Sequence, residues 1–357
     1  MQLYMPTKVY SEENCVAAHA KELAALGKKA MIVTGRSSAK KTGALMDVTT
    51  ALEENGTGYV IFDRVEENPS IETVMEAREQ MLQSGADFCI GIGGGSPMDA
   101  AKAIALMAAN PQVGEEVLYA AQPLKYFPVA CVPTTCGTGS EVTPYAILTR
   151  HAQRTKKSIS YRIYPELALL DAKYLKTMPR TALVNTCVDA LAHLVESFLN
   201  TNTNDLNRIY SREGMRVWAR FKDRLAADTV QEQDLWDMLH ASMIAGMAIT
   251  HTGTSLPHGL SYAVTYEQGI PHGRAVGMFL GGYVENYRGK EDAAEVARLL
   301  GFADAAAFRA YVTGLLGTVE IPESLLRSSV AMVLADPGKL KNYPHPITEE
   351  ELLRMAN

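Results

Sequence analysis

Residues 87–109 read DFCIGIGGGSPMDAAKAIALMAA, an apolar run, a glycine turn and an alanine-rich run in direct succession. The apolar run predicts a buried strand over residues 87–92, and the alanine-rich run predicts a helix over residues 97–108. A strand followed at once by a helix is the repeating element of an α/β fold. The stretch therefore predicts that the first half of the chain forms such a fold.

The glycine turn inside this stretch is suited to an anion. Gly94 and Gly95 allow close approach to a helix start, where free N–H groups and the helix dipole favour negative charge. Ser96 suits the N-cap of this helix, Pro97 its first position and Asp99 the acid of a capping box. The G-x-G-x-x-G fingerprint is absent because Ser96 replaces its last glycine. We predict a pyrophosphate site, with a tight turn that binds no ligand as the alternative.

The rest of the chain divides into two parts of different character. The first part alternates further strands and helices, which predicts a largely parallel sheet. Its expected strands lie at residues 29–34, 59–62, 127–132 and 167–170, and its expected helices at 16–26, 42–54 and 71–84. After about residue 180, leucine, alanine and methionine recur at spacings of three and four residues, as in helices. The expected helices lie at 181–200, 205–224, 231–249, 274–288, 291–301, 304–316 and 322–334.

These patterns predict a Rossmann-like α/β domain with a parallel sheet over residues 1–180. They predict an all-α domain over residues 181–357, in agreement with the length of the chain. The net charge of −6 gives no reason to expect nucleic acid or a membrane surface as a partner. Five cysteines without a CxxC pair, and an N-terminus without a signal-peptide pattern, indicate a cytoplasmic protein with reduced thiols.

A second polar turn and a group of histidines are the remaining candidates for a site. Residues 134–141 read TTCGTGSE and can hydrogen-bond a ligand, although a solvated loop is the alternative. Asp189 and His193 are four residues apart in VDALAHLVES, which places them on one face of a helix. His258 and His272 each stand between Pro and Gly. Gly269 and Pro271 would break a helix between them, and a returning turn would let the two histidines meet.

One carboxylate and three imidazoles suit Fe(II) or Zn(II) and leave room for a substrate oxygen. The alternative is that the two pairs lie on separate helices and never meet.

The residues so far also match a known family. The motifs are GGGSPMDAAKAIA at 93–105, PTTCGTGSEVTPYAILT at 133–149, DALAHLVES at 189–197, and PHG at 257–259 and 271–273. With them the chain resembles the iron-containing (group III) alcohol dehydrogenases, which have the dehydroquinate synthase-like fold.

The resemblance covers nearly the whole chain and implies roles for particular residues. It implies a metal ion, Fe²⁺ or Zn²⁺, held by Asp189, His193, His258 and His272. It also implies a nicotinamide dinucleotide with its pyrophosphate over Gly94, Gly95, Ser96 and Asp99. Further cofactor contacts are implied at Asn68, Thr134, Thr135, Thr138 and Lys157. The implied reaction transfers a hydride between this cofactor and a short-chain primary alcohol or aldehyde, and the implied assembly is a homodimer.

Two positions depart from the pattern of many relatives. Where NAD-preferring members carry an Asp after the first strand, this chain has Gly35, followed by basic and hydroxyl residues that include Ser37. A 2′-phosphate fits this setting, so we predict NADP(H), with a solvated helix start as the alternative. Tyr262 stands where many relatives have a histidine with a proton-relay role. A phenol is a poor base near neutral pH, so packing in the pocket is the expected role of Tyr262.

Three other functions fit a chain of this type. A sugar-phosphate cyclase of the dehydroquinate synthase type would need a cluster of basic residues near His258, and the helical domain shows none. A glycerol dehydrogenase-type enzyme would match these motifs less closely. A non-catalytic NADP(H)-binding sensor would be expected to have lost at least one of the four metal ligands. Turnover of an aldehyde separates the sensor from the enzymes.

Overall fold

The glycine turn joins β4 (Phe88–Gly93) to α6 (Gly95–Ala108) in the computed structural model, which describes residues 3–120 and 122–356. The helix begins two residues earlier than predicted, so Gly94 is its N-cap, and the assignment of Ser96 to that position was wrong. The hydroxyl of Ser96 instead accepts the backbone N–H of Asn68 at 3.1 Å. Asp99 is not a capping-box acid either, because its carboxylate accepts the backbone N–H of Ile147 at 2.9 Å.

This strand lies inside a six-stranded sheet in the order β1-β8-β5-β4-β2-β3, and all its registered neighbours are parallel. The other strands are β1 (Lys8–Ser11), β2 (Lys29–Gly35), β3 (Gly58–Val65), β5 (Val129–Pro133) and β8 (Leu167–Leu170). A separate antiparallel hairpin consists of β6 (Ile147–Arg150) and β7 (Thr155–Ser158). The predicted parallel sheet is confirmed.

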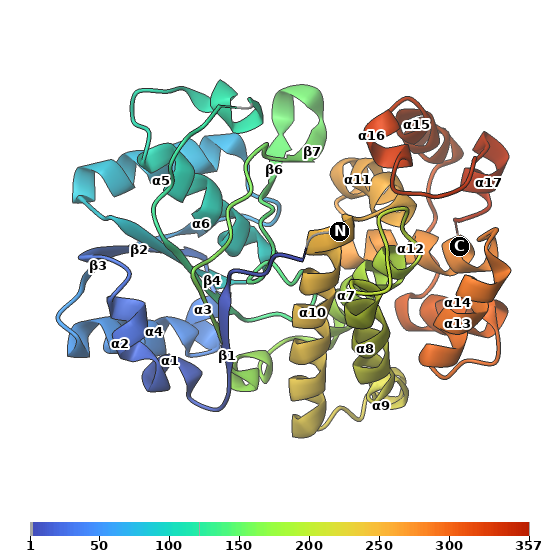
Figure 1. Cartoon of the computed structure of the whole chain (residues 1–357), viewed down its shortest axis with the longest axis horizontal. Coiled ribbons are helices and arrows are strands. Elements are labelled where there is room, and N and C mark those ends of the chain that lie inside the picture. The colour runs from blue at the N-terminus through green and yellow to red at the C-terminus, as the bar shows by residue number, and fades with distance from the viewer. Residues whose placement is uncertain (1–2, 121, 357) are drawn as a thin grey trace. The chain divides into compact units, whose positions relative to one another are not determined.

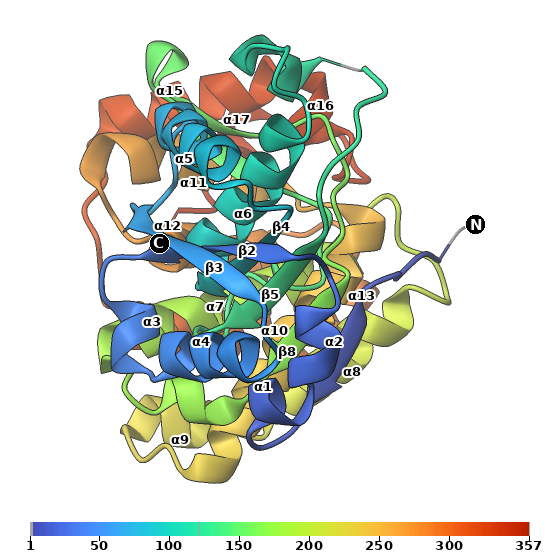
Figure 2. The same ribbon diagram turned by 90° about the vertical axis from the view of Figure 1, so that its left-hand side faces the viewer.

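Helices cover both faces of the sheet, as Figure 2 shows. One face packs against α5 (Ile71–Ser84) and α6, and the other against α1 (Cys15–Ala18), α2 (Ala20–Ala24) and α4 (Ala44–Glu54). Cys89 faces the first layer and Ile90 the second, as expected for neighbours in a buried strand. A Cβ at Gly91 would lie 2.8 Å from the Cα of Met98, so glycine permits the close packing of α6.

Short helices connect some of these elements. They are α3 (Ser38–Lys41) and the 3₁₀ turns η1 (Glu115–Tyr119), η2 (His151–Gln153) and η3 (Ala172–Leu175). The predicted helix over residues 16–26 is interrupted at His19, which is the C-cap of α1 and the N-cap of α2.

From Arg180 onward the described chain is helical (Figure 1). The longer helices are α7 (Arg180–Phe198), α8 (Arg208–Ala219), α10 (Glu232–Thr252), α11 (Leu256–Gln268), α12 (His272–Glu285), α13 (Lys290–Leu299), α14 (Ala305–Leu316) and α15 (Glu323–Leu334). The shorter ones are α9 (Lys222–Ala227), α16 (Pro337–Leu340) and α17 (Glu349–Leu353). The predicted fold class, an α/β part followed by an all-α part, is confirmed. Among the described residues, no helix has the length and apolar character that crossing a membrane requires.

The chain divides into two units. The α/β unit consists of Met5–Thr135 and Ser140–Thr177. The helical unit consists of the residues from Met178 onward, the short segment Cys136–Gly139 and residues 3–4. The segment Cys136–Gly139 therefore packs with the helices, although the sequence places it among the strands.

Candidate metal centre

Helix α7 carries two of the predicted ligands, Asp189 and His193, on one buried face. Their spacing of four residues is slightly more than one helical turn, which places the two side chains above one another. The Nδ1 atom of His193 lies 3.3 Å from the carbonyl oxygen of Gly137. A carbonyl only accepts, so Nδ1 carries the proton and Nε2 of His193 keeps its lone pair for another partner.

The third predicted ligand, His258, lies in the first turn of α11, where Pro257 is tolerated because its missing N–H would have no partner. Its Nε2 atom is 3.4 Å from Oδ1 of Asp189. Both side chains are buried, and neither atom has a hydrogen-bond partner among the residues that the structure describes. Buried polar atoms are nearly always satisfied, so this facing pair marks the place of a missing partner.

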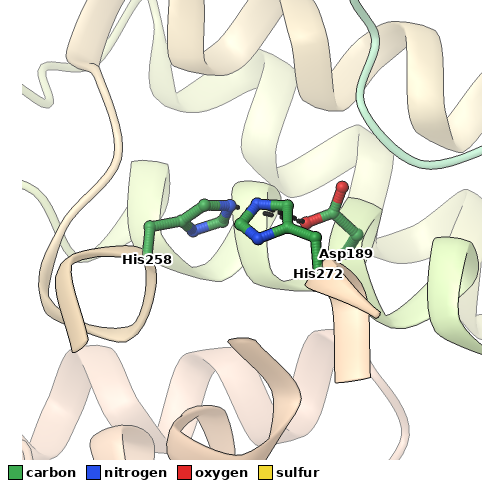
Figure 3. Close-up of side chains that lie close together, drawn as sticks. All are labelled: Asp189, His258 and His272. Carbon is green, nitrogen blue, oxygen red and sulfur yellow. Dashed lines mark ion pairs between the residues drawn. The ribbon is translucent and has the colours of Figure 1, made fainter. Parts of the chain in front are cut away.

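The fourth predicted ligand, His272, is brought back towards the others by a break between two helices. Helix α11 ends at Gly269, whose φ of +64° suits glycine, and α12 begins at His272. The predicted break is therefore confirmed. Nε2 of His272 lies 3.8 Å from Oδ1 of Asp189 (Figure 3). A Cβ at Gly273 would collide with the carbonyl group of Asn185, so glycine lets the start of α12 pack directly on α7.

Three of the four predicted ligands form one cluster. One ligand atom from each of Asp189, His258 and His272 lies within 4.8 Å of the other two. His193 is outside this set, but its ring stacks on the His258 ring with 4.5 Å between the centroids. Oxygen and imidazole nitrogen donors of this kind suit Fe(II) or Zn(II), so the residues present fit a divalent ion. That all four residues bind one ion stays a prediction.

The charges of the cluster follow from burial and from the neighbours. Burial alone would raise the pKa of Asp189, but His193 and the other two imidazoles bring this pKa below its ordinary value. Burial also pulls the pKa of His258 down, yet the carboxylates of Glu196 and Asp189 together raise it to about 9. For His193 burial prevails and lowers the pKa. The centre therefore contains an ionised carboxylate inside an apolar helical core.

Glu196 is a further candidate residue of this site, and the sequence reasoning missed it. Its side chain is fully buried, and its Oε1 lies 2.6 Å from Nδ1 of His258 and 3.2 Å from the backbone nitrogen of the same residue. Its other oxygen accepts the backbone N–H of Ser255, the N-cap of α11. The available signal was its position in DALAHLVES, three residues after His193 and seven after Asp189, which is the same helix face.

The predicted cofactor residues of the α/β unit gather where β4 and β5 end. A Cβ at Gly94 would lie 3.1 Å from the hydroxyl oxygen of Thr135, so these two residues are in contact. The backbone N–H of Thr134 donates to Gly93, and the hydroxyl of Thr134 is buried without a hydrogen-bond partner in the described chain. Ligands of open α/β sheets bind at the carboxyl ends of the strands, which is where this group lies.

The remaining predicted cofactor residues have different surroundings. The amide oxygen of Asn68 accepts the ammonium of Lys156 at 3.0 Å, whereas Lys157 is exposed and lies 5.7 Å from the Tyr119 ring. Asp99 is buried beside Lys102, 3.5 Å away, and its carboxylate bonds within the unit. Gly35 ends β2, Ser37 is the exposed N-cap of α3, and Gly95 begins α6. Thr138 belongs to the helical unit.

Comparisons with known proteins agree with this fold. Residues 6–172 match the family model of iron-containing alcohol dehydrogenase, and residues 183–332 match the C-terminal model of the Fe-containing alcohol dehydrogenase family. A solved structure of an iron-containing alcohol dehydrogenase from Thermotoga maritima superposes with a TM-score of 0.92. The two sequences are 36% identical, and the match covers 99% of this chain and 98% of the other.

Curated relatives show the same similarity. The chain is 31% identical to 1,3-propanediol dehydrogenase from Citrobacter freundii over 319 residues, which cover 87% of this chain and 79% of the relative. It is 30% identical to aldehyde-alcohol dehydrogenase 2 from Entamoeba histolytica, with 80% of this chain covered but only 34% of that longer protein. The matches place the chain among the alcohol dehydrogenases. It belongs to the iron-containing alcohol dehydrogenase family.

Proposed function

We propose that this protein reduces short-chain primary aldehydes, and oxidises the corresponding alcohols, by hydride transfer to and from NADP(H) at a divalent metal ion. The observation that carries the proposal is the buried pair of Asp189 and His258, whose facing oxygen and nitrogen atoms lack hydrogen-bond partners in the described chain. Family membership supports the reaction class.

Asp189, His193, His258 and His272 would hold the ion. When bound, a divalent ion supplies Lewis acidity, which polarises an aldehyde carbonyl and makes an alcohol easier to deprotonate. The residues of the chain do the remaining work. Asp189 would provide the negative charge that offsets the charge of the ion. The three imidazoles would provide neutral nitrogen donors, His258 after it has lost its second proton. Asp189, His193 and His258 are buried, so their charges act in a medium of low polarity.

The preference for NADP(H) rests on the end of β2. Gly35 stands where an acidic side chain would repel a 2′-phosphate, and Arg36 and Ser37 follow it as exposed residues. The ammonium of Lys40 is already paired with Asp63 at 2.6 Å, so Arg36 is the better placed partner of a phosphate. A kcat/KM that is higher with NADPH than with NADH supports this part of the proposal, and the reverse order contradicts it.

The reaction is tested by anaerobic oxidation of NADPH with Fe(II)-loaded protein and butanal, followed at the nicotinamide absorbance. We expect turnover that a chelator abolishes and that added Fe(II) or Zn(II) restores. Asp189→Asn should abolish both turnover and metal binding, while Asp205→Asn, at an exposed position, is the matched control. Full activity of Asp189→Asn would remove the proposed site.

The same assay separates the other functions. A sensor would bind NADPH without turnover, and a sugar-phosphate cyclase or a glycerol dehydrogenase-type enzyme would leave butanal unreacted.

Tyr262 is proposed as a packing residue, since its ring lies 6.1 Å from that of His272. A large rate loss in Tyr262→Phe would instead give it the relay role. We also propose a homodimer, which light scattering after gel filtration can check.

A further inference from the structure

Lys339 is a half-buried cation close to the candidate metal centre. It lies in α16, and its ammonium is 5.4 Å from the centre of the Tyr262 ring. Within the described chain it makes no ion pair, and burial lowers its pKa, an effect that Asp336 offsets only in part. Lysine side chains normally extend their ammonium groups into water. An ammonium that lies against an aromatic ring, with no carboxylate paired to it, is therefore unusual and suggests a role for Lys339.

The surroundings of Lys339 connect it to the metal ligands. Tyr262 lies one turn after His258 on α11, and its ring centre is 6.1 Å from that of His272. A Cβ at Gly259 would lie 3.6 Å from Cδ of Lys339, so the stem of the lysine passes beside the residue that follows His258. The Tyr262 ring is therefore a common neighbour of the Lys339 ammonium and of His272, a proposed metal ligand.

We propose that Lys339, with Tyr262 as its platform, forms a subsite for the anionic end of a short aldehyde or alcohol whose other end reacts at the metal centre. The substrate class is then a short-chain aldehyde with a terminal carboxylate or a similar anion. An anion would supply the partner that Lys339 lacks, and a hydrogen bond between charged groups in a half-buried site is strong. The proposal rests on the proposed function and specifies its substrate.

The test compares two aldehydes that differ only in the terminal anion, succinic semialdehyde and butanal. In the metal-loaded wild-type enzyme we expect kcat/KM to favour succinic semialdehyde. In Lys339→Met the ratio of the two kcat/KM values should fall by about tenfold or more, mainly through KM. Lys339→Arg should keep most of the ratio because it keeps the charge. Lys341→Met, which removes an exposed lysine two residues away, is the matched control and should keep the wild-type ratio.

Binding gives a second result that does not require turnover. Calorimetric titration of the metal-loaded protein with 4-hydroxybutanoate should give a Kd that rises in Lys339→Met and with added salt, but not in Lys341→Met. Equal ratios and equal Kd values in wild type and Lys339→Met would overturn the subsite and leave Lys339 a structural partner of Tyr262. Turnover of butanal in that case would leave the proposed function intact. Absence of all turnover would reject the proposed function, and the titration would still decide the subsite.

Discussion

Oε1 of Glu196 lies 2.6 Å from Nδ1 of His258, and both side chains are buried. A carboxylate in this position only accepts, so Nδ1 of His258 carries a proton, and loss of the second proton would free the lone pair of Nε2, the atom that faces Asp189. Glu196 also holds the start of α11 through the backbone N–H groups of Ser255 and His258. One helix, α7, therefore supplies two proposed metal ligands, Asp189 and His193, and also orients a third one, His258.

This relationship predicts the effect of Glu196→Gln on metal affinity. The amide removes the negative charge and turns an N–H₂ group towards one of the N–H donors that the carboxylate accepts. Partners that orient a metal-bound imidazole typically contribute about 10- to 100-fold to metal affinity. We expect a loss of this size in a chelator competition titration, with Glu213→Gln, at an exposed site on α8, as the control. Unchanged affinity would show that Glu196 serves only to hold the start of α11.

We predict that metal binding and stability depend on glycine at position 273, because this residue packs directly on α7. In Gly273→Ala the added methyl group would collide with the Asn185 carbonyl, so α12 must move away and take His272 with it. We expect weaker metal binding and a loss of stability of about 1–3 kcal/mol. Gly314→Ala on α14 is the matched control, since nothing lies within 4 Å of its added Cβ. It should raise stability slightly, because alanine favours helices. Thermal unfolding of both variants tests the pair.

The buried carboxyl group of Glu141 should make the free energy of unfolding depend on pH. The side chain is buried, one of its oxygens has no hydrogen-bond partner in the described chain, and burial raises its pKa to about 7. The unfolded chain ionises this carboxyl near its ordinary pKa, so ionisation favours unfolding progressively from that value up to about pH 7. Glu141→Gln should therefore stabilise the protein above pH 7, by about 3 kcal/mol, and much less at pH 4.

Denaturant unfolding of wild type and Glu141→Gln at pH 4 and pH 8 measures this difference. Glu115→Gln, an exchange at an exposed site, should show no such change between the two pH values. An effect of Glu141→Gln that is equal at both pH values would mean that the carboxyl keeps one charge state across the range.

The cysteines give a prediction on thiol reactivity. All five are buried thiols outside any disulfide, and the sulfur atoms of Cys136 and Cys187 share a hydrogen bond at 3.8 Å. Burial raises the pKa of the Cys187 thiol, and only the thiolate is reactive. Ellman's reagent should therefore react slowly with the native protein and with all five thiols in denaturant. Rapid reaction of one thiol before unfolding would show that its surroundings open in solution.

Particular elements show how far the sequence predicts this structure. The strand at residues 87–92 and the helix after it were predicted because apolar runs and glycine turns are local signals. The start of that helix was misplaced, because Gly94 and Gly95 can begin a helix without a side-chain cap, and Ser96 and Asp99 were free to bond elsewhere. Helix boundaries depend on such partners, and the partners come from distant parts of the chain.

The sequence by itself determined the fold class, the family and the break between His258 and His272, because periodicity, motif and glycine or proline chemistry are local properties. Only the tertiary structure decided that Asp189, His258 and His272 meet, with His193 stacked beside them. It alone revealed Glu196 behind His258, since α7 and α11 are more than fifty residues apart along the chain. Such contacts are made by packing between helices, and the spacing of residues along one segment does not encode them.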